Sequence, residues 1–407
     1  MPALVELDAQ NFRSLQDVKV RLGGFNVLVG PNGSGKSNLL DLIRFIGDSV
    51  RSDLGPALEI RGGFNEVCFR GAKAKHIRIG VVTNVTSYSS SNALDEYTLD
   101  FRLARLRRRT PGAPPDYVLV RDESFRFKRT KSQGRRITIQ GSRVDIVDTQ
   151  PGGKERTASR DLLRKDSLAL ATLPRLSDEA GGTQIRQIAE LFSSFRVFDI
   201  DVTAAREPSL LASRTELAPN ARNLAAFLLY LRDDCEADQY SRLLEDARAF
   251  VPGLRELHFV AVGGADEAVA LELEEDELPG RTKLADASFG TIRALALLAL
   301  LYDPHPPDLT CIEEIDHGLH PYVFDRLTDR LREASSRTQL IIATHSPAFV
   351  NRLQPQELIV CERDRETGAS LIPAIDVAEA EAVAASADQL GLGELWFSGT
   401  LGGVPTP

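Results

Sequence analysis

One short stretch near the N-terminus constrains the fold of this chain more than any other. Residues 25–38 read Phe-Asn-Val-Leu-Val-Gly-Pro-Asn-Gly-Ser-Gly-Lys-Ser-Asn, and positions 30–37 fit the pattern G-x-x-x-x-G-K-[ST]. The mostly apolar residues before the first glycine predict a buried strand over Phe25–Val29. Residues 39–46 place apolar side chains on one side of a helix. A strand, a glycine-rich loop and a helix are together the setting in which this pattern forms a phosphate-binding loop.

The residue types in this loop suit the binding of a triphosphate. Glycines allow the backbone to turn several N–H groups inward toward phosphate oxygens, and the start of a helix adds the positive end of its dipole. We expect Lys36 to reach the β- and γ-phosphates and the Ser37 hydroxyl to occupy one position around Mg²⁺. The alternative is a glycine-rich turn without a ligand. The loop residues that we predict to contact the nucleotide are Gly30, Pro31, Asn32, Gly33, Ser34, Gly35, Lys36, Ser37 and Asn38.

Bulk properties place the chain among ordinary soluble proteins and exclude some classes. With 407 residues the chain can form two or three domains with a large core. Its net charge of −9 argues against a protein that is basic all over. The four cysteines are far apart in apolar surroundings, which predicts reduced thiols in a cytoplasmic protein. The longest apolar run, from Ala294 to Tyr302, is too short to cross a membrane, so we expect no membrane association.

Apolar periodicity predicts a mixed α/β chain with four regions. Short strand-like segments between 97 and 147, separated by Pro, Gly and charged turns, indicate an antiparallel hairpin lobe. Outside it, the expected strands are 3–12, 16–22, 25–29, 60–69, 77–85, 254–262 and 268–273. The expected helices are the one after the loop, 159–173, 182–194, 220–233 and 236–250, with a loop at 152–160. The regions are an N-terminal lobe (1–96), an inserted β-hairpin and helical region (97–251), a C-terminal lobe (252–374) and a tail (375–407).

The hairpin lobe carries an excess of positive charge. Between positions 101 and 145 there are 13 lysines and arginines against 4 acidic residues, although the whole chain is acidic. The charges could belong to a solvated hairpin face or to a surface that follows a nucleic-acid backbone. The residues of this basic patch are Arg105, Arg107, Arg108, Arg109, Arg126, Lys128, Arg129 and Lys131.

Three further motifs follow in a fixed order in the C-terminal lobe. The first motif is Ser288-Phe-Gly-Thr-Ile-Arg293, which precedes a strongly apolar helix. Ser288 could simply be the N-cap of that helix. A short apolar strand from Leu309 then ends in Glu313-Glu314. Beside a phosphate-binding loop, such a pair of acids can hold Mg²⁺ and orient a water. A second strand, 339–344, ends in Thr344-His345-Ser346, with one helix (322–335) between the two strands. This βαβ spacing allows both strand ends to lie side by side.

The order of these motifs resembles the ABC-type ATPase head of the SMC/RecF/OLD-like group. It is similar to the compact bacterial AAA family ATPases of the AAA_21 type, which lack coiled-coil arms. Residues 11–15, Asn-Phe-Arg-Ser-Leu, and 391–396, Gly-Leu-Gly-Glu-Leu-Trp, also look like that group. The resemblance implies an α/β fold: a P-loop NTPase, an ABC-ATPase-like head with an antiparallel β-lobe and a helical insertion.

The resemblance also implies a site shared by two protomers. In such heads a homodimer forms head to tail on ATP binding and encloses two ATP molecules with Mg²⁺. By resemblance, Arg13 would join the nucleotide-binding residues, and Glu313 would hold the metal together with Ser37. Glu314 would polarise the attacking water and His345 would sense the γ-phosphate. The signature residues that would contact the ATP of the other protomer are Ser288, Gly290 and Thr291.

Two features depart from that group. Glu313 stands where an aspartate is more usual, and no glutamine occurs between Gln16 and Gln133 to act as the Q-loop residue. The leading hypothesis is an ATP hydrolase whose dimer performs DNA-related work, in repair or as the sensor of a phage-defence pair with a separately encoded nuclease or toxin. The alternatives are the ATPase subunit of a transporter and a nucleotide-gated binding module with negligible turnover.

Overall fold

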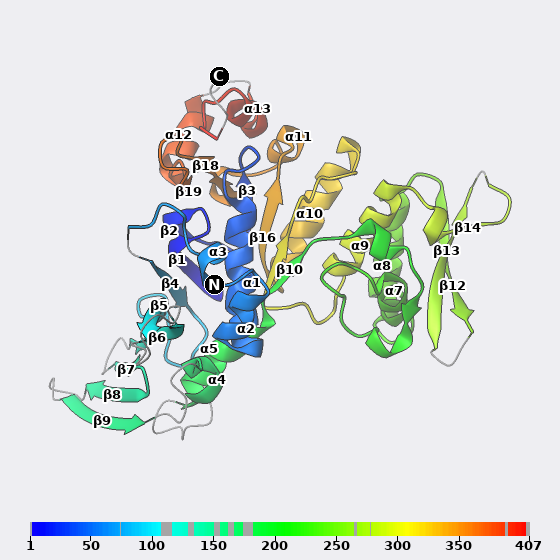
Figure 1. The fold of residues 1–407 in the computed structure, drawn as a ribbon. Helices are drawn as coiled ribbons and strands as arrows, with labels where there is room; N and C mark the ends of the chain where they lie inside the picture. The colour runs from blue at the N-terminus through cyan, green and yellow to red at the C-terminus, as the bar shows by residue number, and fades with distance from the viewer. Residues whose placement is uncertain are drawn as a thin grey trace.

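The chain folds around two sheets of different type that share one core (Figure 1). The computed structural model describes residues 2–73, 75–106, 116–128, 134–149, 155–161, 167–173, 182–263, 267–276, 278–386 and 390–403. Within these residues, no helix is both long and apolar enough to cross a membrane.

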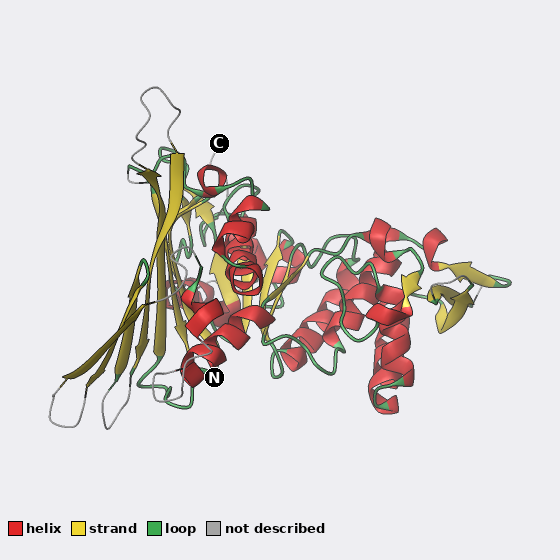
Figure 2. Cartoon of the chain, turned by 60° about the horizontal axis from the view of Figure 1, so that its bottom comes forward, coloured by secondary structure: helices red, strands yellow, loops and turns green. Residues whose placement is uncertain are grey.

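The largest sheet has eight strands, all paired antiparallel, in the order β2-β1-β4-β5-β6-β7-β8-β9. Buried and more exposed side chains alternate along β4, as expected when one face of a sheet lies on the core. Figure 2 shows this sheet as the long layer at the left of the molecule. Its strands are β1 (Leu4–Phe12), β2 (Leu15–Arg21), β4 (His76–Thr83), β5 (Asp95–Leu106), β6 (Asp116–Phe127), β7 (Arg135–Gln140), β8 (Arg143–Thr149) and β9 (Glu155–Asp161).

The second sheet has five parallel strands in the order β10-β15-β16-β3-β17. Every residue of β3, β15 and β16 is buried, as is usual for a parallel sheet that is covered on both faces. Its strands are β3 (Phe25–Val29), β10 (Arg196–Phe198), β15 (Leu309–Ile312), β16 (Gln339–Thr344) and β17 (Leu358–Val360). Because all five run the same way, their carboxyl ends lie along one edge, where ligands bind in such sheets.

Both faces of the parallel sheet are packed. On one face, Leu28 and Ile341 share a core with α1 (Lys36–Ser52) and with the eight-stranded sheet. On the other, Val27 and Ile342 share a core with α9 (Phe289–Leu301) and α10 (Phe324–Ala334). The helix after the glycine-rich loop therefore lies between the two sheets, and α9 lies on the far side of the parallel one.

The remaining elements form a helical lobe and peripheral segments. A small sheet of β11, β13, β12 and β14 lies beside α7 and α8 at the right of Figure 1. The other helices are α2 (Leu54–Glu59), α3 (Phe64–Val67), α4 (Ala169–Thr172), α5 (Gly182–Ser194), α6 (Val202–Ala205), α7 (Leu224–Asp233), α8 (Ala237–Phe250), α11 (Pro347–Val350), α12 (Val377–Ser386) and α13 (Leu392–Phe397). The other strands are β11 (Ser209–Leu210), β12 (Leu254–Val262), β13 (Ala268–Glu275), β14 (Arg281–Lys283), β18 (Glu362–Arg363) and β19 (Ser370–Leu371).

Three local predictions are wrong. Residues 60–69 are not a strand, because Gly62 and Gly63 adopt φ of 85° and 92°, a left-handed conformation that ends extended structure. The expected loop at 152–160 instead contributes to β9, an edge strand whose side chains are all exposed and therefore show no apolar alternation. Of the expected helix 159–173, the described residues are helical only over α4.

The eight-stranded sheet also bears on the proposed regions. It continues from β1 and β2 through β4 into β5, so hydrogen bonding crosses the expected boundary between 96 and 97 without a break. The antiparallel lobe is thus an extension of the N-terminal sheet. The division of the chain into four regions stays a proposal from sequence.

Candidate active site at the ends of the parallel strands

The glycine-rich loop connects β3 to α1 at the carboxyl edge of the parallel sheet. β3 is fully buried between β16 and β17, which fixes the point where the loop begins. Gly33 and Gly35 have φ of 80° and 108°, which glycine adopts without steric cost. A Cβ at Gly35 would lie 2.0 Å from the hydroxyl oxygen of Ser370, so a larger residue would not fit there.

Lys36 is buried inside this loop. Its Nζ donates hydrogen bonds to the carbonyls of Gly30 at 2.7 Å and Pro31 at 3.0 Å. Burial lowers the pKa of Lys36 to about 8, although the negative charges of Glu314 and Asp316 act in the opposite direction. An ammonium group is therefore held by loop carbonyls at the place where the phosphates of a bound nucleotide would need it.

Two polar groups indicate that the loop fits a phosphate and a cation. The Ser34 hydroxyl is buried and has no hydrogen-bond partner among the described residues, an arrangement that costs free energy unless a ligand satisfies it. The Ser37 hydroxyl lies near the carboxylate of Glu313 and acts to lower the pKa of that group. This brings together two oxygen ligands of the kind that Mg²⁺ prefers. These residues fit ATP and Mg²⁺, the two expected cofactors.

Glu313 follows directly after β15. Burial raises the pKa of its carboxyl group, and the negative charge of Asp199 raises it further. Nη2 of Arg44, on α1, lies 3.4 Å from Oε1 of Glu313 and partly offsets its charge. Glu313 therefore sits in a partly buried position where a cation would stabilise its ionised form.

Glu314 lies on a sharp turn beyond Glu313. Its φ of 48° is left-handed, and the N–H of Ile315 donates to the Ala343 carbonyl at 3.1 Å, which anchors this turn to β16. The Glu314 carboxylate is largely exposed and contacts His317, whose Nδ1 lies 3.2 Å from Oε2. An exposed carboxylate on a fixed turn can reach a water that enters from solvent.

His345 follows β16, beside the acidic strand end. The residues that line one shared cavity of about 410 Å³ are Asn32, Glu314, Asp316, His317 and His345. Burial lowers the pKa of His345 and the charge of Lys36 lowers it further, whereas the nearby backbone of Gly30 acts in the opposite direction. A neutral imidazole thus lies against the glycine-rich loop. The structure brings loop, acidic turn and histidine together, as the βαβ spacing predicts.

The signature segment lies elsewhere. The Ser288 hydroxyl caps α9 by accepting the N–H of Thr291 at 3.1 Å. Ser288, Gly290 and Thr291 line a different cavity, of about 520 Å³. Gly290 is required by close packing, because a Cβ there would lie 2.5 Å from the carbonyl oxygen of Gly318. Within one protomer, these residues do not line the cavity beside the glycine-rich loop.

Two residues that the sequence analysis missed join the signature helix to the acidic turn. The ring of Phe289 packs against that of His317 in a tilted arrangement, with centroids 4.9 Å apart and planes at 48°. Arg293 is buried, and its guanidinium donates to the backbone carbonyl of Glu313 at 2.9 Å and to that of Glu314. An arginine at the start of an otherwise apolar helix was the available signal for this contact.

Arg13 is engaged away from the loop. Its Nε lies 2.6 Å from Oδ2 of Asp41, which also pairs with Arg61 at 3.0 Å. The neighbouring Ser14 hydroxyl accepts a hydrogen bond from the Asn38 side chain at 2.6 Å. The role of Arg13 in nucleotide binding stays a prediction.

The basic patch is only partly described. Arg107, Arg108, Arg109, Arg129 and Lys131 lie outside the described residues. Arg105 is exposed on β5, whereas Arg126 and Lys128 both pair with Glu96. At least two of the charges are therefore partly neutralised.

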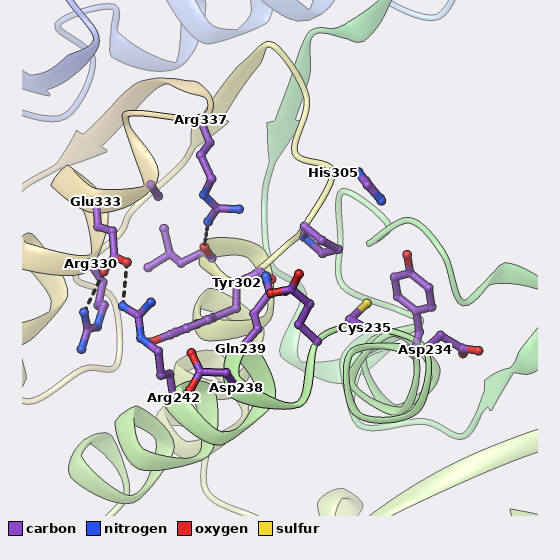
Figure 3. A pocket seen from close by; sticks show the side chains of 15 residues that line it. Asp234, Cys235, Asp238, Gln239, Arg242, Tyr302, His305, Arg330, Glu333 and Arg337 are labelled. Atoms are coloured by element: carbon purple, nitrogen blue, oxygen red, sulfur yellow. Dashed lines mark hydrogen bonds and ion pairs between the residues drawn. The ribbon is translucent and has the colours of Figure 1, made fainter.

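A cavity of about 720 Å³ lies away from this site, between α7 and α8 on one side and the last turns of α9 and α10 on the other (Figure 3). Its arginines are already engaged: Arg242 pairs with Glu333, Arg330 pairs with Asp246, and Arg337 donates to backbone carbonyls. In the described part of the chain, no group of three His, Cys, Asp or Glu residues could hold a metal ion. This cavity therefore offers no free charge for a phosphate.

Comparison with protein families decides the identity of this fold. Residues 25–351, most of the chain, match the AAA_21 family, described as "AAA domain, putative AbiEii toxin, Type IV TA system". The chain belongs to this family. The match includes the glycine-rich loop, the signature, the acidic turn and His345.

This AAA_21 protein is also similar to curated Smc proteins. It is 25% identical over 262 residues to the chromosome partition protein Smc of Methanocaldococcus jannaschii, covering 61% of this chain and 20% of that protein. It is 29% identical over 152 residues to the chromosome partition protein Smc of Mesomycoplasma hyorhinis, covering 36% and 14%. The chain thus spans a fifth or less of the length of these relatives.

Solved structures show the same fold. An Smc head bound to the C-winged helix domain of ScpA matches 94% of this chain and all of its own, with a TM-score of 0.54 and 17% identity. An Smc head from Pyrococcus furiosus with an extended coiled coil matches 96% of this chain and all of its own, with a TM-score of 0.51 and 14% identity. These neighbours confirm the predicted P-loop NTPase head. The AAA_21 protein is an SMC-like ATPase head without coiled-coil arms, since no described helix exceeds the 17 residues of α1.

Proposed function

We propose that this protein hydrolyses ATP and that its ATP-bound form is a head-to-tail homodimer that performs DNA-related work. One observation carries the proposal: the loop, the acidic turn and His345 share one cavity, while the signature Ser288 lines a different, neighbouring cavity of the same protomer. A second protomer can bring its signature to the first protomer's cavity, so the complete site needs two chains.

The contacts support the following roles in hydrolysis. Lys36 offsets the charge of the β- and γ-phosphates, and Ser37 and Glu313 hold Mg²⁺, which neutralises charge on the phosphate oxygens when bound. Glu314, exposed on its turn, accepts a proton from the attacking water. His345, beside the loop at the edge of the same cavity, senses the γ-phosphate. Ser288 and the first N–H groups of α9 face the γ-phosphate held by the partner.

The DNA-related part rests on sequence and on the relatives. The Smc relatives are named for chromosome partition, and the family description names a toxin of a toxin–antitoxin system. Both names are consistent with an ATPase that acts in DNA repair, or in phage defence beside a separately encoded nuclease or toxin. The excess of positive charge in the antiparallel lobe offers a surface for DNA.

Phosphate release from ATP and light scattering with and without ATP test this function together. We expect turnover by the wild type, none by Lys36→Ala, and a doubling of mass with ATP. ATP binding without turnover would instead make the chain a nucleotide-gated binding module. Co-purification with a membrane protein would favour the transporter subunit.

A further inference from the structure

A hairpin in the C-terminal part of the chain packs against the glycine-rich loop. β18 begins just after β17 and pairs antiparallel with β19, which places Arg363 opposite Ser370. Two glycines of the loop lie so close to this segment that neither could carry a side chain there. A Cβ at Gly30 would lie 2.2 Å from the Cys361 carbonyl oxygen, and a Cβ at Gly35 would lie 2.0 Å from the Ser370 hydroxyl oxygen. The hairpin therefore forms one wall of the loop that we propose to hold the phosphates.

Ser370 joins this hairpin to a chain of polar contacts. It is buried, and its Oγ lies 2.6 Å from Oγ of Ser14, in the turn between β1 and β2. The Ser14 hydroxyl in turn accepts a hydrogen bond from Nδ2 of Asn38 at 2.6 Å. Asn38 is in the first turn of α1. Three segments that are far apart in the sequence thus meet at the start of the helix that follows the glycine-rich loop.

This chain of contacts orients the amide group of Asn38. An amide NH₂ group has two N–H donors, and Ser14 accepts from one of them. In the described part of the chain, the Asn38 side chain forms no other hydrogen bond, so its second donor is available to a ligand. A phosphate at the start of α1 is an acceptor for such a donor. The Ser14 hydroxyl that orients Asn38 is itself held by Ser370.

We propose that Ser370 is a positioning residue for nucleotide binding that acts through Ser14 on Asn38. The inference rests on the proposed function, because it requires ATP at the glycine-rich loop. A side chain that is oriented before the ligand arrives loses less conformational freedom on binding, which increases affinity. The backbone N–H of Ser370 also donates to the Ser14 carbonyl at 2.8 Å, a contact that does not need the side chain. Ser370→Ala should therefore remove the hydroxyl and leave the hairpin in place.

Isothermal calorimetry with a non-hydrolysable ATP analogue and Mg²⁺ tests this role without turnover. Ser370→Ala should weaken binding about fivefold, the size expected for the loss of one hydrogen bond. Ser14→Ala should cause a similar loss, and it provides the test if Ser370→Ala does not fold. Asn38→Ala should weaken binding at least as much as either. In the Asn38→Ala background, Ser370→Ala should have no further effect, because the group that Ser370 positions is gone.

Thr367→Ala is the matched control. Thr367 belongs to the same hairpin, and its exposed hydroxyl donates to the Asp364 carboxylate at 2.7 Å rather than to Ser14. This variant should bind the analogue like the wild type. Wild-type affinity in Ser370→Ala, a loss that adds to that of Asn38→Ala, or an equal loss in Thr367→Ala would overturn the assignment of Ser370. A wild type that binds no nucleotide would overturn the proposed function as well, which separates the two failures.

Discussion

His317 pairs with the carboxylate of Glu314: its Nδ1 lies 3.2 Å from Oε2, and its ring also packs, tilted by 48°, against Phe289 beside the signature. No other side chain among the described residues pairs with Glu314. The signature segment and the proposed general base are thus joined through one imidazole. In the proposed dimer, a partner docked at the signature would act on the proposed base through this contact.

This contact predicts the behaviour of His317→Ala. The free Glu314 side chain should sample more orientations, and we expect kcat to fall about tenfold because a misoriented base transfers protons less well. Nucleotide affinity should stay within about twofold, since the ion pair of His317 is with Glu314 and not with the glycine-rich loop. Steady-state kinetics and calorimetry provide the two measurements.

His320→Ala is the control for that variant. His320 is three residues further on; its ring packs, tilted by 40°, against that of Tyr322 with centroids 5.1 Å apart, whereas the ion pair with Glu314 is made by His317. It should leave kcat nearly unchanged. Equal losses in both variants would show that the turn, rather than the His317 contact, sets the rate.

Glu314→Gln should bind ATP and lose hydrolysis by about 10²- to 10⁴-fold, because an amide cannot accept a proton from water. An ATP-dependent dimer should then accumulate in light scattering. Asp316→Asn is the comparison variant, since Asp316 is an acid of the same turn as Glu314. Its carboxylate accepts a hydrogen bond from Thr344, at the end of β16. If Asp316→Asn abolishes turnover while Glu314→Gln does not, the general base has been assigned to the wrong acid.

The helical lobe depends on one buried aspartate. Burial opposes ionisation of Asp246, but hydrogen bonds from Arg330, Tyr302 and Arg326 outweigh it and hold the pKa of Asp246 below its usual value. Asp246→Asn should lower the free energy of unfolding by about 2 kcal/mol, less than for a fully buried pair because the arginines are partly exposed. Denaturant titrations measure this difference.

The same pKa shift gives that difference a pH dependence. A carboxyl group whose pKa is depressed in the folded state stabilises the fold above its unfolded pKa and loses this contribution as pH falls through the folded one. The gap between wild type and Asp246→Asn should therefore be constant above about pH 5 and shrink below about pH 4. Asp276→Asn, which removes an exposed pair with Arg255, should cost less than about 0.5 kcal/mol. A gap that widens in acid would refute this account of Asp246.

The antiparallel lobe is predicted to bind DNA through its charge. Replacing Arg107, Arg108 and Arg109 by alanine should weaken binding to all sequences alike. The slope of log K against log salt should flatten by up to about 3, as expected for the loss of three phosphate contacts. Fluorescence anisotropy with duplexes of different sequence measures both effects.

A second triple substitution controls for net charge. Replacing Arg242, Arg248 and Arg255 by alanine removes the same amount of charge from the helical lobe. Each of these arginines pairs with an acidic residue. This variant should keep the wild-type slope. If both triple variants change the slope equally, the basic patch is only a solvated face.

Local patterns predicted the parts of this site that depend on neighbouring residues. The loop around Lys36 was recognisable because glycine positions, flanking strand and helix are all local, and the βαβ spacing predicted that Glu314 and His345 meet. The position of Asp199 near Glu313 could not be predicted in this way, because β10 has only three residues and the place of that strand beside β15 is set by tertiary packing.

The failed element predictions have similar causes. The segment around Gly62 and Gly63 has strand-like composition, but its backbone conformation is set by the two glycines. The exposed strand β9 pairs with β8, and it has no apolar face whose alternation would predict a strand. Arg293 could be seen in the sequence, but its partners are backbone carbonyls that only the fold identifies.

Mixing two inactive variants tests the head-to-tail site most directly. Ser288→Arg should bind ATP like the wild type, because Ser288 lies away from its own loop, but should not dimerise or turn over. Lys36→Ala should not bind ATP. In the mixed dimer, one site combines the intact loop of the Ser288→Arg chain with the intact signature of the Lys36→Ala chain. The account predicts that ATPase activity returns on mixing, whereas loss of ATP binding by the Ser288→Arg monomer, or no activity in a mixed dimer shown to form, would contradict it.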